Sequence, residues 1–244
     1  SANRKITDSA ASGTAMATGK KTYNGAIGVD TSRMEIRNIT EVVSAMGWNT
    51  GVVSTSSITH ATPASFYAHV EQRGMEEEIA LQLIRSEIDF FAGGGIRFFN
   101  RRSDGKNLLP LAEENGFSVD TTGLDIDHPE PDQKYGFLLA PGGMPTMLEG
   151  RGSFLPDATS MAIDALSADG DSFFLMVEGS QIDWAGHDND AEYLLSEMRD
   201  FEQAVRLAMD FAEKDGNTLV VITADHETGG VSLVSASEVH EESG

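Results

Sequence analysis

The apolar positions of the chain fall into short runs rich in β-branched and aromatic residues. Five such runs stand out, at residues 51–55, 88–94, 135–140, 172–179 and 217–225. Their apolar character is nearly continuous and does not alternate with polar residues, which is typical of strands buried on both faces of a parallel sheet. We therefore predict a parallel sheet built on these runs.

Between the runs, apolar residues recur with helical spacing. The segments with this spacing are residues 10–19, 38–47, 75–87, 158–170 and 190–215. Asn38 with Glu41 three residues later predicts a capping box at a helix start, and Gly47 marks the stop. Because strand and helix alternate, we expect an α/β fold: a doubly wound, mostly parallel sheet with helices on both faces. Residues 97–152 are richer in Gly, Pro, Asn and Asp, and they predict peripheral connections within one domain spanning residues 1–244.

The composition narrows the possible partners. The 244 residues carry a net charge of −22, from 39 acidic and 17 basic residues, and no cysteine. Such a chain repels nucleic acid and anionic membranes, so neither is expected as a partner. No apolar run reaches the roughly 18 residues needed for a membrane span. An enzyme of this charge that acts on phosphate esters would need metal ions or a buried arginine to invert the field at its site.

Polar residues gather where the predicted strands end. Glu178 ends the run at 172–179, Asp225 and His226 end the run at 217–225, and residues 54–62 follow the run at 51–55. The carboxyl ends of parallel strands meet at one edge of the sheet, where open α/β folds bind ligands. We therefore expect the functional site at this edge.

Two pairs of Asp and His indicate metal binding. Asp183 and His187 are four residues apart, but Gly186 between them favours an irregular loop that turns both side chains inward. Asp225 and His226 are adjacent and cannot point the same way on a regular strand, so we place them at its frayed end. Each pair alone could lie in a solvated loop; two pairs after buried strands favour a two-metal site. Asp and His side chains suit Zn²⁺, whereas Glu178 suits Mg²⁺.

Ser9 is the candidate nucleophile. Asp8 or Ser9 could simply cap the helix at residues 10–19, but a helix N-terminus also favours an anion such as phosphate. No histidine close in sequence suggests a general base, so a metal ion would have to deprotonate the serine. Arg73 is either a surface arginine or a bidentate partner for a phosphoryl group. We expect the remaining histidines to lie in loops, in helices or on the solvated surface: His60, His69, His128 and His240.

The motifs DSAAS, THATPASFYAH with Arg73, VEGSQIDWAGH and TADH, in this order, resemble those of the alkaline phosphatases. The resemblance covers residues from Thr7 to about Gly230. It implies hydrolysis of small phosphate monoesters in two displacements, with Ser9 as the phosphorylated nucleophile. It further implies that Asp8 orients Arg73, which clamps two phosphate oxygens.

The same resemblance implies a site for two Zn²⁺ and one Mg²⁺. Its ligand assignments are Asp183 and His187 for the first zinc, Asp225 and His226 for the second, which also binds and activates Ser9, and Thr62 and Glu178 for the magnesium. His60 and Trp184 occupy positions that vary in the family, and they would contact substrate and tune phosphate release. Relatives are usually exported dimers, which implies a periplasmic or secreted protein and a possible homodimer.

Two departures from the family pattern change this expectation. The family has a further metal-bridging Asp before the serine block and a third zinc His in a Gly-His-Thr context, whereas only seven residues precede Asp8 and His240 has neither the spacing nor the neighbours. Each zinc set is then one ligand short, and peripheral strands and one central strand would be missing. The comparison predicts a partial chain that binds metal weakly and has little activity alone.

Two other functions stay open. One is a related phosphodiesterase or sulfatase, which the DSAAS motif with Arg73 disfavours. The other is a truncated or degenerate domain that binds phosphate or metal without turnover.

Overall fold

A computed structural model describes residues 1–126, 128–130 and 133–232. Its centre is a five-stranded sheet in the order β3-β4-β2-β1-β5. All four neighbouring pairs are parallel, as the continuous apolar runs predict. The strands are β1 (Asn49–Ser57), β2 (Phe90–Gly94), β3 (Phe117–Asp120), β4 (Lys134–Leu138) and β5 (Phe173–Glu178).

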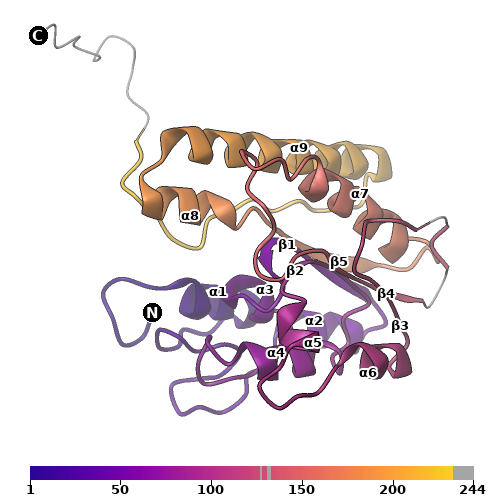
Figure 1. Cartoon of the computed structure of the whole chain (residues 1–244), viewed down its shortest axis with the longest axis horizontal. Coiled ribbons are helices and arrows are strands. Elements are labelled where there is room, and N and C mark those ends of the chain that lie inside the picture. The colour runs from indigo at the N-terminus through magenta and orange to yellow at the C-terminus, as the bar shows by residue number, and fades with distance from the viewer. Residues whose placement is uncertain (127, 131–132, 233–244) are drawn as a thin grey trace, which may run out of the picture.

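Helices cover both faces of this sheet (Figure 1). One layer holds α1 (Ser9–Thr18), α2 (Ile39–Ser44), α3 (Ala61–Ala64), α4 (Glu76–Leu83), α5 (Arg97–Asn100) and α6 (Leu109–Glu114). The opposite layer holds α7 (Phe154–Leu166), α8 (Gln181–Asp188) and the long α9 (Ala191–Asp215). The predicted fold class, a parallel α/β sheet with helices on both faces, is confirmed.

Consecutive strand residues supply the two cores, because side chains of a strand point alternately to its two faces. Phe91 packs with Phe99 and Phe117 in the cluster under the first helical layer. Phe90 packs with Phe137 in the cluster under α7. Both β2 rings are fully buried. β2 is therefore buried on both faces, which explains its unbroken apolar sequence.

Local sequence signals explain where the helices begin and end. Asn38 and Glu41 form the predicted capping box at the start of α2. Asp8 caps α1 by accepting a hydrogen bond from the Ala11 N–H, and Gly19 ends that helix in the left-handed conformation. Each cap satisfies helix-end backbone groups that would otherwise lack partners.

The strand predicted at residues 217–225 is wrong. These residues form no ladder within the part of the chain that the structure describes, and their apolar side chains face solvent. Leu219 is 85% exposed and Val221 is 73% exposed. A strand needs a hydrogen-bonded neighbour, and β5 pairs with β1 alone among the described strands. Among the residues that the structure describes, the apolar run thus has no partner that would make it a strand.

Residues 97–152 hold more structure than connections alone. They contain α5, α6 and β3 as well as the predicted β4. β3 is the edge strand and has a single described neighbour, β4. Only its first residue, Phe117, is buried, so its short sequence carries little apolar signal.

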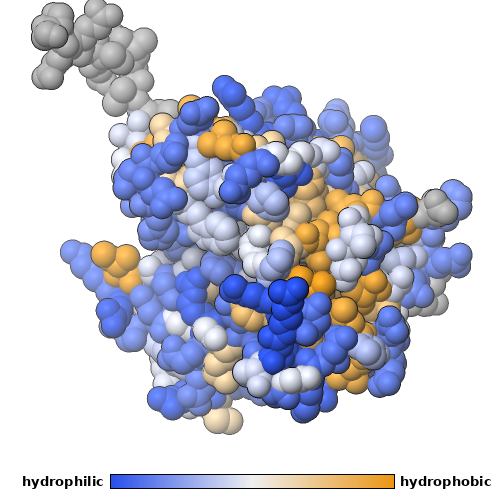
Figure 2. Space-filling view, viewed as in Figure 1, coloured by the Kyte–Doolittle hydropathy of each residue, from blue (hydrophilic) through white to orange (hydrophobic). Residues whose placement is uncertain are grey.

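The surface agrees with the acidic composition. Figure 2 shows a mostly hydrophilic face, with apolar side chains gathered in a band between the upper helices and the lower part of the molecule. Among the helices described, none combines the length and the apolar character that a bilayer crossing requires.

Candidate active site

Ser9 is the first residue of α1 and lies at the N-terminal end of its dipole. Its side chain has a partner that the sequence does not suggest: Ser9 Oγ lies 3.0 Å from His226 Nε2, although 217 positions separate the two residues. His226 Nδ1 lies 3.1 Å from the Glu227 carbonyl oxygen. If Nδ1 donates to that carbonyl, the lone pair of Nε2 faces Ser9 and can accept its proton or bind a cation.

Arg73 lies between Asp8 and His60. Its guanidinium is 3.6 Å from Asp8 Oδ2 and 3.0 Å from His60 Nε2. Asp8 also accepts hydrogen bonds from the N–H groups of Ala11 and Gly25, which fix the carboxylate. The predicted orientation of Arg73 by Asp8 therefore has a geometric basis. Burial, followed by the charge of Arg73, lowers the pKa of His60 to about 4, so its ring is neutral at pH 7.

Glu178 is partly buried at the carboxyl end of β5, and its carboxylate lies among hydroxyl groups. Ser54 Oγ and Ser180 Oγ donate to its Oε2 at 2.8 and 2.5 Å. Burial raises the pKa of Glu178, and hydrogen bonds from Ser180, Ser54 and Thr62 oppose this rise. The structure thus joins the ends of β1 and β5, as the strand-end argument predicts, and it brings Thr62 and Glu178 together.

Asp183 and His187 lie on helix α8 and not in the irregular loop predicted from Gly186. Their side chains are 3.6 Å apart, one turn along the helix. The glycine serves a different purpose: a Cβ at Gly186 would lie 2.9 Å from the Thr228 carbonyl oxygen. Gly186 therefore allows the loop after residue 225 to approach α8 closely.

That close approach brings the second Asp–His pair to the site without a strand. Thr228 Oγ1 donates to Asp183 Oδ1 at 2.5 Å. Asp225 Oδ2 lies 3.3 Å from His226 Nε2. Asp225 also contributes to the electrostatic field at both His60 and Glu178. All the predicted carboxylate and histidine ligands therefore lie around one edge of the sheet.

The donor types fit metal binding, but the ligand sets are incomplete. Within the described ranges, no three His, Asp or Glu side chains converge tightly enough to hold one ion. Among the described residues, the hydrogen-bond partners of the Glu178 carboxylate are hydroxyl groups, and carboxylate and hydroxyl oxygens suit a harder cation. Each Asp–His pair predicted to bind zinc contains two protein ligands, with Ser9 as a further expected ligand beside Asp225 and His226, while tetrahedral zinc sites use three or four protein ligands. These side chains are of the types that bind metal ions, but among the described residues they do not converge on a single ion position.

Trp184 borders the site from α8. Its ring meets the His60 ring edge to face, with centroids 5.9 Å apart. The structure therefore links the two variable positions, His60 and Trp184, to each other and to Arg73. His128 is exposed, as predicted, and His240 lies outside the described residues.

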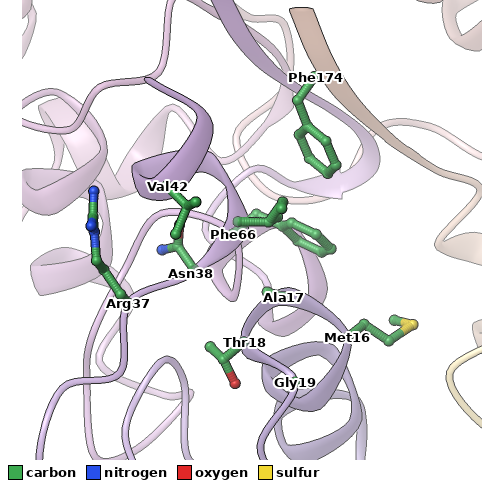
Figure 3. A pocket seen from close by; sticks show the side chains of 10 residues that line it. Met16, Ala17, Thr18, Gly19, Arg37, Asn38, Val42, Phe66 and Phe174 are labelled. Atoms are coloured by element: carbon green, nitrogen blue, oxygen red, sulfur yellow. The ribbon is translucent and has the colours of Figure 1, made fainter. Parts of the chain in front are cut away.

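A pocket of about 320 Å³ lies elsewhere, at the C-terminal end of α1 (Figure 3). Its lining includes Met16, Phe66 and Phe174 together with Arg37 and Asn38. Ser9 begins the same helix, so roughly 13 Å of helix separate it from this pocket. The largely apolar lining does not suit a phosphate, and we do not assign the site there.

The sequence did not predict Ser180 and Thr228 as site residues, and it placed Ser54 in the segment 54–62 at the site without indicating its contact with Glu178. Ser54 and Ser180 bind Glu178, and Thr228 binds Asp183. Ser180 and Thr228 stand inside the motifs VEGS and ADHETGG, so proximity to a predicted ligand was the available signal. The contact between Ser9 and His226 has no local signal.

Comparison with known proteins gives a consistent result. A family model described as alkaline phosphatase matches residues 1–243. Alkaline phosphatase 4 of Bacillus subtilis is 45% identical over 241 residues, covering 96% of this chain and 52% of the relative. Alkaline phosphatase of Escherichia coli is 34% identical over 272 residues, covering 91% of this chain and 58% of the relative. The chain thus spans about half the length of the curated relatives it matches.

Solved structures agree. The alkaline phosphatase from the Antarctic bacterium TAB5 superimposes with a TM-score of 0.92 at 53% identity, covering 94% of this chain and 68% of that one. A variant of that enzyme, with one histidine replaced by aspartate, is described with Mg bound in its M3 site and has the same TM-score, 0.92, at 52% identity.

Proposed function

Because this chain belongs to the alkaline phosphatase family, we propose that the protein hydrolyses small phosphate monoesters through a phosphoserine at Ser9. The observation that carries this proposal is the link that Asp8 makes between Ser9 and Arg73. Asp8 connects the two, since it caps the helix that begins at Ser9 and also pairs with Arg73.

Each of these side chains has a distinct task in the reaction. Arg73 would bind two oxygens of the phosphoryl group, and the N-terminal dipole of α1 would favour the negative charge. Ser9 Oγ would release its proton to water, attack phosphorus and form the O–P bond of phosphoserine, while the ester O–P bond breaks and the leaving alkoxide takes a proton from water. Water would then attack the phosphoserine, releasing inorganic phosphate and returning a proton to Ser9.

Metal ions would bind at the residues already assigned by the family resemblance. Asp183 with His187 and Asp225 with His226 would hold two zinc ions, and Glu178 with Thr62 would hold magnesium. When bound, these ions would supply the positive charge that phosphoryl transfer needs and would lower the pKa of coordinated oxygen. In a chain of net charge −22, they and Arg73 would make the site attractive to a dianion.

The most direct test is to trap the phosphoserine. The 244-residue chain, incubated with Zn²⁺, Mg²⁺ and p-nitrophenyl phosphate and then quenched in acid, should carry a phosphoryl group on the peptide that contains Ser9. Ser9→Ala should abolish this adduct. Ser12→Ala is the matched control, because Ser12 lies one turn away on α1 and donates to the Asp8 carbonyl oxygen; it should retain the adduct.

Zinc binding and hydrolysis rates, measured alongside the trapping experiment, separate the competing functions. Stoichiometric zinc binding with no adduct would favour a domain that binds phosphate or metal without turnover. Faster hydrolysis of diesters or sulfate esters than of monoesters would favour the phosphodiesterase or sulfatase alternative. Robust steady-state turnover by the 244-residue chain would contradict the expected weakness of an incomplete ligand set. Export beyond the cytoplasm and a homodimer stay predictions from the family resemblance.

A further inference from the structure

The loop of residues 143–147 is fastened to the elements that carry the candidate site. The Met144 N–H donates to the Thr55 carbonyl oxygen on β1 at 3.0 Å. Gln181, the fully buried first residue of α8, donates from Nε2 to the carbonyl oxygens of Met144 and Thr55 at 2.7 and 3.0 Å. Tyr193 on α9 donates to Gln181 Oε1 at 2.8 Å. One amide thus joins the loop to β1, α8 and α9.

A buried ion cluster fastens the same loop from its other end. Arg151 donates to the Pro145 carbonyl oxygen at 3.0 Å, and Glu197 Oε1 accepts from the Met147 N–H at 2.9 Å. Arg151 also pairs with Glu197 and, at 2.7 Å, with Asp200, and all three side chains are at most 1% exposed. Charged hydrogen bonds that are shielded from water hold their geometry strongly. These contacts therefore restrain the loop in its position against α8.

Gly143 begins this loop and lies directly against Trp184. A Cβ at position 143 would lie 2.5 Å from Trp184 Cη2 and 2.8 Å from Cζ3, closer than real Cβ atoms come. The neighbouring Gly142 differs, because a Cβ there would meet nothing within 4 Å. Neither glycine has a positive φ. Glycine is required at 143 for space and not for backbone conformation.

We propose that the 143–147 loop is a positioning element, which sets the place of the Trp184 ring against His60 and thereby holds His60 in contact with Arg73. The chain of contacts is continuous: Gly143 to the Trp184 ring, that ring to His60 at 5.9 Å, and His60 Nε2 to Arg73 at 3.0 Å. Gly143 acts through Trp184 and does not touch the phosphate. The inference rests on the proposed function only for the role of Arg73 in binding phosphate.

The first test measures the ring itself. Trp48→Phe leaves Trp184 as the single tryptophan, because the chain has two. In that background, Gly143→Ala should shift the emission maximum of Trp184 and change its quenching by acrylamide, since the anchored loop forces the ring to move. Gly142→Ala should change neither. An unchanged Trp184 signal in a folded Gly143→Ala variant would overturn the proposal.

The second test follows the consequence at Arg73 in the metal-loaded protein. Gly143→Ala should raise the KM for p-nitrophenyl phosphate by about ten-fold with kcat nearly unchanged, as expected when phosphate binding weakens equally in ground and transition states. Gly142→Ala should leave both unchanged. If Gly143→Ala raises KM without moving the Trp184 signal, the effect does not pass through the ring and the proposal fails.

A double-variant cycle isolates the pathway and guards against misfolding. Trp184→Ala removes the ring, so adding Gly143→Ala should then have no further effect on KM. An equal effect in both backgrounds would contradict the proposal. The double variant should also unfold at the same urea concentration as Trp184→Ala, even if Gly143→Ala alone is unstable. Absence of the Ser9 phosphoryl adduct in the metal-loaded, unaltered protein would count against the proposed function, while the fluorescence comparison would still decide the role of the loop.

Discussion

The middle strand and one edge strand of the sheet have similar apolar sequences, but they differ in burial. β2, near the middle, is buried over all five residues, whereas all six residues of β5, at the edge, are only partly buried. The next apolar run, at residues 217–225, is not in the sheet at all. All three segments are rich in Phe, Val, Leu or Ile. Apolar character thus measures the tendency to be buried in a strand, and a paired neighbour decides whether burial occurs.

The difference matters because the candidate site takes residues from both the well-packed part of the fold and the exposed segment that follows residue 217. Ser9, Arg73 and residues 54–62 depend on the well-packed part, while His226 reaches Ser9 from the exposed segment. Two of the seven predicted metal ligands, Asp225 and His226, are therefore held by the few contacts of residues 225–229 with α1 and α8, while the other five lie on α1, α3, β5 and α8. Weak metal binding by this chain would follow from that imbalance.

The largest expected effect is on stability, and it should separate a substitution in the buried strand β2 from one in the exposed segment at residues 217–225. Phe91→Ala removes a fully buried ring packed on Phe99 and Phe117, and it should lower the free energy of unfolding by about 3–5 kcal/mol. Val221→Ser alters a side chain that is 73% exposed and should change it by less than about 0.5 kcal/mol. Urea unfolding measures both. If Val221→Ser lowers the free energy of unfolding by more than about 1 kcal/mol, roughly twice the limit for a surface substitution, residues 217–225 are packed in solution. The contrast in burial with β2 would then not hold.

Local residue patterns predicted most of the fold, and long-range contacts were beyond their reach. β1, β2, β4 and β5, and the caps at Asn38 and Asp8, follow from periodicity and capping rules. The strand at 217–225 was predicted wrongly because periodicity cannot report a missing neighbour. The loop at 183–187 was predicted wrongly because Gly186 was taken as a helix breaker, whereas it makes room for Thr228.

The location of the candidate site was predictable from the sequence, and its contacts were not. The positions of polar residues at strand ends predict that they gather at one sheet edge, and the structure brings them together there. The approach of His226 to Ser9 depends on the fold of the chain between them, over a separation of 217 positions, and no local pattern contains it. The contact of Gly143 with Trp184 is of the same kind, since the need for a glycine there depends on a ring 41 positions away.

A second comparison sets buried charge against exposed charge on α9. Arg151→Met leaves the buried carboxylates of Glu197 and Asp200 without their cation, and it should lower the free energy of unfolding by about 3–5 kcal/mol. Burial already raises the pKa of Asp200 despite that cation. Arg206→Met breaks an exposed pair with Glu202 on the same helix and should have no measurable effect. Equal unfolding midpoints for the two variants in urea would mean that the cluster around Arg151 does not stabilise the fold.

The smallest effect concerns two aspartates at the amino end of the sheet, one on each side of β1. Asp89 accepts from the Thr50 N–H at 2.8 Å and faces Lys134 at 3.6 Å, and burial raises its pKa. Asp169 is exposed, and a hydrogen bond from the Asn49 side chain, followed by one from the Asp171 N–H, lowers its pKa. The two carboxyl groups should therefore give opposite dependences of stability on pH.

The signs follow from proton binding. Above about pH 4, the usual value for an unfolded Asp, folded Asp89 keeps a proton that the unfolded chain releases, so the free energy of unfolding falls as pH rises through its raised pKa. Folded Asp169 stays ionised below that pH, so its contribution is present above the unfolded pKa and is lost as pH falls through the lowered one. Relative to wild type, Asp89→Asn should gain stability with rising pH above about 4, and Asp169→Asn should lose stability with rising pH below about 4. Urea unfolding across this range measures both slopes, and slopes of the same sign would show that the two sides of β1 do not differ in burial.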